Sequence, residues 1–218
     1  MRKNTSVWRE NLDWTARVLK DSKYKCVTAA DPDFPIQLKN SKNLPLALFY
    51  KGDFNLLKAK KRHFIISKAT KKDISESDLM NIEDKVPLIY LDNENEKAFL
   101  NKLNQENKSS VVILSHQDES LINRYGDKNL IIWFNTNPRH PLRHDFGIRN
   151  FVASCFCDSL VLVDVEKSKK LWSLISNYSE VGKTVICYET DVNYQQRNWF
   201  YENDLPVAFM NEPTEIQI

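Results

Sequence analysis

The stretch LVLVDVEKSKKLWSLISNYSEVGKTVICY, residues 160–188, shows the pattern on which the chain is built. Its two ends, Leu160–Val165 and Thr184–Tyr188, are short apolar runs, which are typical of strands buried on both faces of a parallel sheet. Between them, Ser168–Val181 places apolar residues near the 3.6-residue period of a helix, and Gly182 suits the end of that helix. The stretch therefore predicts a strand, a helix and a second strand.

The same alternation extends in both directions along the chain. Helices are predicted over Glu94–Glu106 and Phe146–Cys157. Further short apolar runs are Ala47–Tyr50, Phe64–Ser67, Pro87–Leu91, Val111–Leu114, Leu130–Phe134 and Pro206–Phe209. We therefore expect an α/β fold, an extended Rossmann-like, mostly parallel doubly wound sheet with helices on both faces. Ligands of such sheets bind beyond the carboxyl ends of the strands.

The N-terminal segment has a different pattern. Ser6–Leu19 reads as one amphipathic helix, and Asp31–Pro35 reads as a turn. We interpret residues 1–45 as a short helix-and-turn appendage packed on a Rossmann-like domain at residues 46–218. The total of 218 residues fits one such domain.

Composition excludes several classes of protein. Only four glycines are present, too few for a GxGxxG dinucleotide loop or a Walker A loop. The four cysteines form no CxxC pair, so reduced thiols are expected and a zinc site is not. No apolar run reaches the ~18 residues of a membrane helix, and no signal peptide is recognisable. We expect a cytoplasmic protein that needs no metal and no cofactor and does not contact membranes.

The net charge is only +2, so a nucleic-acid surface would have to come from local clusters of basic residues. Residues 58–72 contain Lys and Arg but no acid, and Lys68, Lys71 and Lys72 follow a predicted strand. The position after a strand favours an anionic ligand. A solvated lysine-rich surface is the alternative.

A second cluster lies in Asn137–Asn150, before and within a predicted helix. Arg139, Arg143 and Arg149 could pair with phosphates, because guanidinium groups bind phosphate bidentately. Phe146 could stack on a base. The alternative is an ordinary helix N-terminus in which Arg149 and Asn150 are tied internally.

Enzymatic sites are less well supported by the residues. Ser115 lacks the glycines of a nucleophile elbow, and His116–Glu119 reads as a polar loop. Asp164 and Glu166 are expected to form surface ion pairs with nearby lysines rather than a magnesium site. Trp172 and Trp199 are interpreted as packing residues.

Two sequence motifs carry a family resemblance. The first is DFPIQL at residues 33–38 followed by PLALFYKGDFNLL at 45–57, and the second is FGIRNFVA at 146–153. They resemble motifs of the DNA-processing protein A (DprA/Smf) family, and the resemblance spans about residues 24–210. It implies a Rossmann-like homodimer that binds single-stranded DNA in a basic pocket. It also implies a role in DNA recombination and transformation (competence), with loading of a RecA-type recombinase and no enzymatic activity.

By this resemblance, Arg143, Phe146, Arg149 and Asn150 match the basic pocket of the family. The glycine-rich phosphate loops of the family are missing, because Ser67–Ala69 and Asp92–Glu96 stand in their places. The second loop is acidic, so it is expected to repel phosphate. The predicted DNA-binding residues are Lys68, Lys71, Lys72, Arg139, Arg143, Phe146, Arg149, Asn150 and Lys169.

The sequence therefore predicts a single-stranded-DNA-binding accessory protein of recombination and DNA uptake, with eroded phosphate loops. The alternative is a degenerate Rossmann-fold dimeric scaffold that binds a protein partner without DNA. A third class, a phosphoribohydrolase-like enzyme, lacks its PGGxGT motif here.

Overall fold

A computed structural model describes residues 24–39, 45–66, 85–134, 143–189 and 191–211. The strands are β1 (Lys25–Thr28), β2 (Ala47–Lys51), β3 (Lys61–Ile66), β4 (Val86–Ile89), β5 (Val111–Ile113), β6 (Leu130–Trp133), β7 (Ser159–Val163), β8 (Thr184–Glu189) and β9 (Val207–Asn211). The helices are α2 (Ile36–Lys39), α4 (Glu94–Gln105), α5 (Glu119–Tyr125), α6 (Arg143–Phe156), α7 (Lys169–Glu180) and α8 (Asp191–Glu202), with a short 3₁₀ helix, η1 (Phe54–Lys58).

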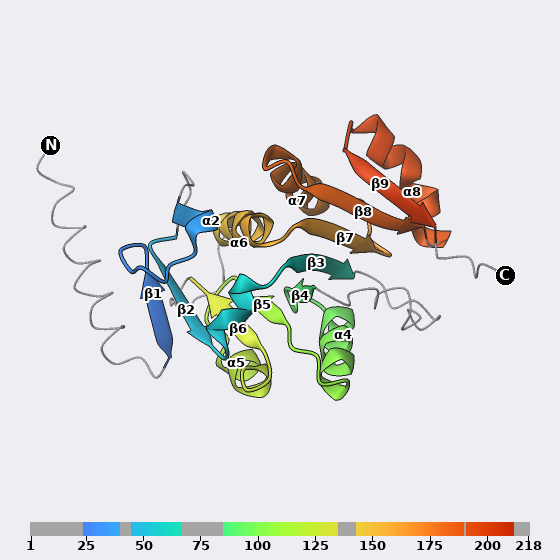
Figure 1. The fold of residues 1–218 in the computed structure, drawn as a ribbon. Coiled ribbons are helices and arrows are strands. Elements are labelled where there is room, and N and C mark those ends of the chain that lie inside the picture. Colours follow the sequence, from blue (N-terminus) through green and yellow to red (C-terminus); the bar gives the residue numbers. More distant parts are fainter. Residues whose placement is uncertain (1–23, 40–44, 67–84, 135–142, 190, 212–218) are drawn as a thin grey trace, which may run out of the picture.

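The strands form one sheet in the order β1-β2-β6-β5-β4-β3-β7-β8-β9 (Figure 1). All neighbours from β6 to β9 are parallel, whereas β1 and β2 pair antiparallel at one edge. After β3 the chain builds outward through β4, β5 and β6, and it then returns to the other side of β3 to add β7, β8 and β9. The order of the strands therefore reverses between β3 and β7, which is where doubly wound sheets bind their ligands.

Helices cover both faces of the sheet and enclose two hydrophobic clusters (Figure 1). One cluster contains Leu38 of α2, Val152 of α6, Ile175 of α7 and Phe200 of α8. The other contains Leu100 of α4 together with residues of α5. Each central strand is buried on both sides; β5, β6 and β7 have no residue outside the core. Continuous apolar runs are the sequence signature of such strands.

These observations confirm the predicted fold class and all eight predicted strands. The strand β1 was not predicted, because Lys-Cys-Val-Thr is short and only partly apolar. It lies within the predicted appendage but joins the main sheet through β2. The helix expected at Ser6–Leu19 lies outside the described residues. The prediction of a turn at Asp31–Pro35 is correct, since the Phe34 amide donates a 3.2 Å hydrogen bond to the Asp31 carbonyl oxygen.

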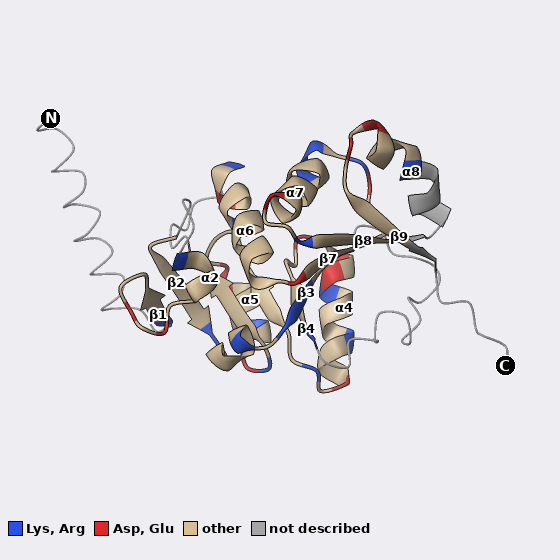
Figure 2. Ribbon diagram, turned by 45° about the horizontal axis from the view of Figure 1, so that its top comes forward, with Lys and Arg blue, Asp and Glu red and all other residues tan. Residues whose placement is uncertain are grey.

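Three α-helices were also missed. One is α2, a single turn that follows the predicted turn at Asp31–Pro35. The second is α5, whose first residue lies in the segment His116–Glu119 that predicts a polar loop; Asp118 caps this helix by accepting a hydrogen bond from the Leu121 amide. The third is α8, which joins β8 to β9. Acidic and basic residues are scattered over both faces of the sheet in the described part of the chain (Figure 2). None of the helices in that part is both long and apolar enough to cross a membrane.

The scarcity of glycine is reflected in the backbone φ angles. In the described part of the chain, four non-glycine residues have positive φ, and two of these, Leu91 (φ 68°) and Asp164 (φ 46°), lie just after β4 and β7. Positive φ is sterically costly for residues with a Cβ, and it is uncommon for leucine in particular. Beside the strand reversal, the chain therefore turns sharply after β4 and after β7 without the glycine that such turns usually contain.

Candidate nucleic-acid interface

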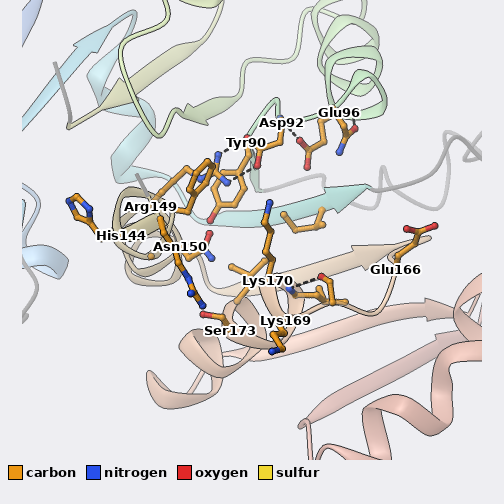
Figure 3. A pocket seen from close by; sticks show the side chains of 18 residues that line it. Tyr90, Asp92, Glu96, His144, Arg149, Asn150, Glu166, Lys169, Lys170 and Ser173 are labelled. Atoms are coloured by element: carbon orange, nitrogen blue, oxygen red, sulfur yellow. Dashed lines mark hydrogen bonds and ion pairs between the residues drawn. The ribbon is translucent and has the colours of Figure 1, made fainter. Parts of the chain in front are cut away.

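A pocket of about 960 Å³ opens beside the strand reversal. Its floor includes Ile65 of β3 and Tyr90, which follows β4. One wall comes from the start of α4, and the opposite wall comes from the first turns of α6 and α7 (Figure 3). The pocket therefore lies at the carboxyl ends of the strands, where the fold places ligands.

The central contact of the pocket is an ion pair between Arg149 of α6 and Asp92 (Figure 3). Nη1 and Nη2 of Arg149 each donate a hydrogen bond of 2.6 Å to one oxygen of the Asp92 carboxylate. The guanidinium lies 3.8 Å from the ring centroid of Tyr90, and the Arg149 side chain is only 5% exposed. Burial by itself lowers the pKa of Arg149, but the hydrogen bonds and charge of Asp92 outweigh it and raise that pKa. Arg149 is thus a permanently charged, internally paired group.

Asp92 is held in place by its own neighbours along the chain. Leu91, at φ 68°, turns the backbone sharply, and the Asp92 amide then donates a 2.7 Å hydrogen bond to Oε2 of Glu96. Asn93 caps α4 by accepting hydrogen bonds from the amides of Asn95 and Glu96, each at 2.9 Å. The segment that replaces a glycine-rich loop is therefore ordered by a helix cap and an ion pair.

Glu96 is almost fully buried in this arrangement, at 2% exposure. Burial raises the pKa of its carboxyl group from 4.5 to about 7, and the charge of Asp92 adds to the rise. Because the folded-state pKa lies above the unfolded value, the folded protein binds the proton more tightly. Glu96 therefore favours folding below about pH 4.5, and this contribution is lost as the pH rises through about 7.

Replacing Glu96 with glutamine is expected to raise the free energy of unfolding at pH 8 by up to about 3 kcal/mol. Glutamine keeps an oxygen acceptor for the Asp92 amide but carries no charge to bury. Denaturant unfolding at pH 5 and pH 8 measures the effect, which should be small at the lower pH. Glu94→Gln, at an exposed carboxylate of the same helix, is the matched control. A loss of stability at pH 8 in Glu96→Gln would contradict this account.

Phe146 provides the aromatic surface of the pocket. It is half-buried in the first turns of α6, with the Arg149 guanidinium 5.1 Å from its ring centroid and the Lys170 ammonium at 5.7 Å. Arg149 is buried, whereas Lys170 is exposed on α7. Lys170 can therefore leave the ring at small cost, since it gives up only a solvated contact.

The structure brings five of the predicted DNA-binding residues into this pocket. These residues are Arg143, Phe146, Arg149, Asn150 and Lys169. The other four, Lys68, Lys71, Lys72 and Arg139, lie outside the described residues. Arg143 and Lys169 are exposed, and no acidic side chain in the described ranges pairs with either of them. Arg149, in contrast, is tied internally, which was the alternative interpretation of this segment.

The acidic loop Asp92–Glu96 carries less negative charge than its sequence suggests. Its acidity was expected to repel phosphate, but Asp92 is neutralised by Arg149 and Glu96 has a pKa of about 7. The sequence did not single out Tyr90, which lies 4.3 Å from the His63 ring and under the Arg149 guanidinium. Burial, with the charge of Arg149, holds the pKa of His63 well below its usual value. His63 is therefore a neutral support rather than part of a cationic surface.

Two other interpretations of the sequence were wrong. Asp164 is not a surface residue, because it is fully buried and neither carboxylate oxygen has a hydrogen-bond partner in the described ranges. Trp172 is not a packing residue, because it is 46% exposed. Lys61, in the basic run at residues 58–72, is buried, and its ammonium donates to the carbonyls of Leu57 and Ala59. Lys61 is therefore not part of a solvated surface, whereas the choice between the two interpretations of the run depends on Lys68, Lys71 and Lys72, which lie outside the described residues.

Solved structures that share this fold include those of two DNA processing proteins. DNA processing protein A from Streptococcus pneumoniae matches with a TM-score of 0.75 and 17% identity, over 95% of this chain and 79% of that one. DNA processing protein A from Helicobacter pylori, whose single-stranded DNA binding mode is described as unique, matches with a TM-score of 0.66 and 14% identity. That match covers 89% of this chain and 93% of the other. No protein-family model and no curated protein matches the chain. The resemblance seen in the sequence is thus confirmed at the level of the fold.

Proposed function

We propose that this chain, which has the fold of DNA processing protein A, is a divergent member of that family and binds single-stranded DNA. The observation that carries the proposal is the pocket itself, in which residues that match the sequence motifs of the family gather at the strand reversal. The similarity of fold to a protein that binds single-stranded DNA supports the same conclusion.

The α6–α7 wall of the pocket offers groups that suit both parts of a nucleotide. Arg143, Lys169 and Lys170 lie on the α6–α7 wall and are exposed, so they can contact phosphates. Phe146 offers a ring on which a base can stack once Lys170 moves toward a phosphate. Stacking and phosphate contacts do not read base edges, so we expect binding with little dependence on sequence.

Binding of a labelled oligonucleotide, followed by fluorescence anisotropy at about 50 mM salt, tests this function because phosphate contacts are strong there. Changing Arg143 and Lys169 together to alanine is expected to weaken binding by about a hundredfold or more, since each of the two charge-assisted hydrogen bonds contributes about 1.5–3 kcal/mol. Lys128→Ala is the matched control, because Lys128 is an exposed lysine just before the amino end of β6, whereas the pocket lies at the carboxyl ends of the strands. Equal binding by the double variant and the wild type would contradict the proposed site.

The wider role that the resemblance implies belongs to the same proposal. It comprises homodimer formation, loading of a RecA-type recombinase onto the bound strand, action in the cytoplasm during DNA uptake and recombination, and no catalysis. Light scattering of the purified chain tests the dimer. A pull-down with recombinase, with and without nuclease treatment, tests the partner.

A second candidate function is a scaffold that binds a protein partner without DNA. The observation in its favour is the pairing of Arg149 with Asp92, which removes one guanidinium from the set available to phosphate. The anisotropy experiment separates the two candidates, because the scaffold predicts no oligonucleotide binding while its partner is still captured after nuclease treatment.

A further inference from the structure

The buried position of Arg149 raises the question of what this residue does in the proposed site. An arginine has five N–H donors, and phosphate recognition uses its terminal fork. Here both terminal nitrogens donate to Asp92, and Nε is buried without a hydrogen-bond partner in the described part of the chain. With its side chain 5% exposed, Arg149 offers little of its guanidinium to the open pocket, although it lines the pocket.

A move of Arg149 toward a phosphate would break this arrangement. The guanidinium would leave the face of Tyr90, 3.8 Å away, and would separate from Asp92. Breaking a buried ion pair is costly, because the charge left behind has lost its partner. Arg143 and Lys169 are exposed at the same pocket, so phosphate can be bound without that cost.

Asp92, the partner of Arg149 in the ion pair, is also held in place by its neighbours. Leu91 is in the left-handed region, at φ 68°, although it is a buried leucine, and the Asp92 amide is bound by Glu96. Strained backbone persists only where the surrounding structure fixes it, and it often marks a functional site. The strained turn presents the Asp92 carboxylate to α6 across the pocket floor, where a glycine loop would otherwise approach the ligand.

We propose that Arg149 is a positioning residue that contacts no DNA: its ion pair with Asp92 closes the β4 side of the pocket and supports the Phe146 ring for base stacking. The support is direct, because the guanidinium contacts both rings, at 3.8 Å from the centroid of Tyr90 and 5.1 Å from the centroid of Phe146. This inference rests on the proposed function, since it assigns a role within the same DNA site.

The test removes the ion pair without changing the net charge. In the double variant Arg149→Met, Asp92→Asn, the affinity for an oligonucleotide is measured from about 50 to 200 mM salt, the range over which phosphate contacts weaken strongly. We expect a several-fold weaker affinity with an unchanged slope of log affinity against log salt. A slope smaller in magnitude by about 0.7, the share of one phosphate contact in a single strand, would overturn the proposal. An unchanged affinity would overturn it too.

Arg143→Ala is the matched control, because Arg143 lies in the same helix and is assigned to phosphate; its slope should fall by about 0.7. If the double variant does not fold, Arg149→Lys replaces it. Lysine keeps the charge but loses the fork, so a positioning role predicts weaker binding with the wild-type slope. Wild-type-like binding by Arg149→Lys would contradict the proposal.

The link to Phe146 has its own readout. If Arg149 acts through the ring, the loss in the double variant should disappear in a Phe146→Ala background and on an oligonucleotide that carries abasic residues, because residues that act together are not additive. A loss of the same size in both cases would overturn the link. Failure of the wild type to bind any oligonucleotide would instead contradict the proposed function.

Discussion

Replacing Asp92 with alanine is expected to lower the free energy of unfolding by about 3 kcal/mol, near the low end of the range for breaking a buried ion pair. The Arg149 side chain is 5% exposed and would keep its charge without a partner, whereas Asp92 is 47% exposed and already partly solvated. The loss of stability therefore comes mainly from the Arg149 guanidinium, which stays buried without a partner. Denaturant unfolding monitored by circular dichroism measures it.

The chain offers a matched control for this variant. Asp127 pairs with Lys51 at 3.0 Å, but its side chain is 81% exposed. Exposed pairs contribute about 0–1 kcal/mol, so Asp127→Ala should be nearly neutral. The charge-balanced pair Arg149→Met, Asp92→Asn should recover much of the stability lost in Asp92→Ala, because no buried charge remains. Equal effects of Asp92→Ala and Asp127→Ala would contradict the buried ion pair.

Replacing Phe146 with alanine is expected to weaken binding of single-stranded DNA by about tenfold to a hundredfold, since stacking on an aromatic side chain contributes about 1–3 kcal/mol per base. Phe146 is half-buried and lies among cationic side chains, so its ring is the described aromatic surface best placed to stack on a base in this pocket. Fluorescence anisotropy measures the change.

Tyrosine at position 146 keeps the ring and is the conservative control. Phe146→Tyr should bind nearly as well as the wild type, whereas Phe146→Ala should bind poorly at every salt concentration, because stacking is not an ionic contact. Circular dichroism of both variants checks that α6 is intact. Equal affinities for all three proteins would show that no base stacks on this ring.

Much of the fold could be predicted because the central strands are buried on both faces. Burial of that kind requires consecutive apolar residues, as in Leu160–Val163, and these are visible in the sequence. The strand β1 escaped prediction because its position at the edge of the sheet leaves Lys25 exposed and relaxes the apolar pattern. Pairing with β2, not the local sequence, makes it a strand.

The location of the candidate site could be predicted from the sequence, but the contacts among its residues could not. The segment that contains Arg143, Phe146 and Arg149 could be found because basic and aromatic residues open a helix after a strand. The partner of Arg149 is 57 positions away in the sequence and was read as a repulsive acid. Only the fold shows that these two charges neutralise each other. The burial of Asp164 was likewise hidden, since a carboxylate beside several lysines normally lies at the surface.

The central claim is that the pocket at the strand reversal binds single-stranded DNA. The most direct measurement is the affinity of the wild-type protein for a single-stranded oligonucleotide as the salt concentration rises from about 50 to 200 mM. Contacts from Arg143, Lys169 and Lys170 predict binding that weakens with a slope of at least about 2 in magnitude, at about 0.7 for each phosphate. No binding at the lowest salt concentration, or binding that does not change with salt, would contradict the claim.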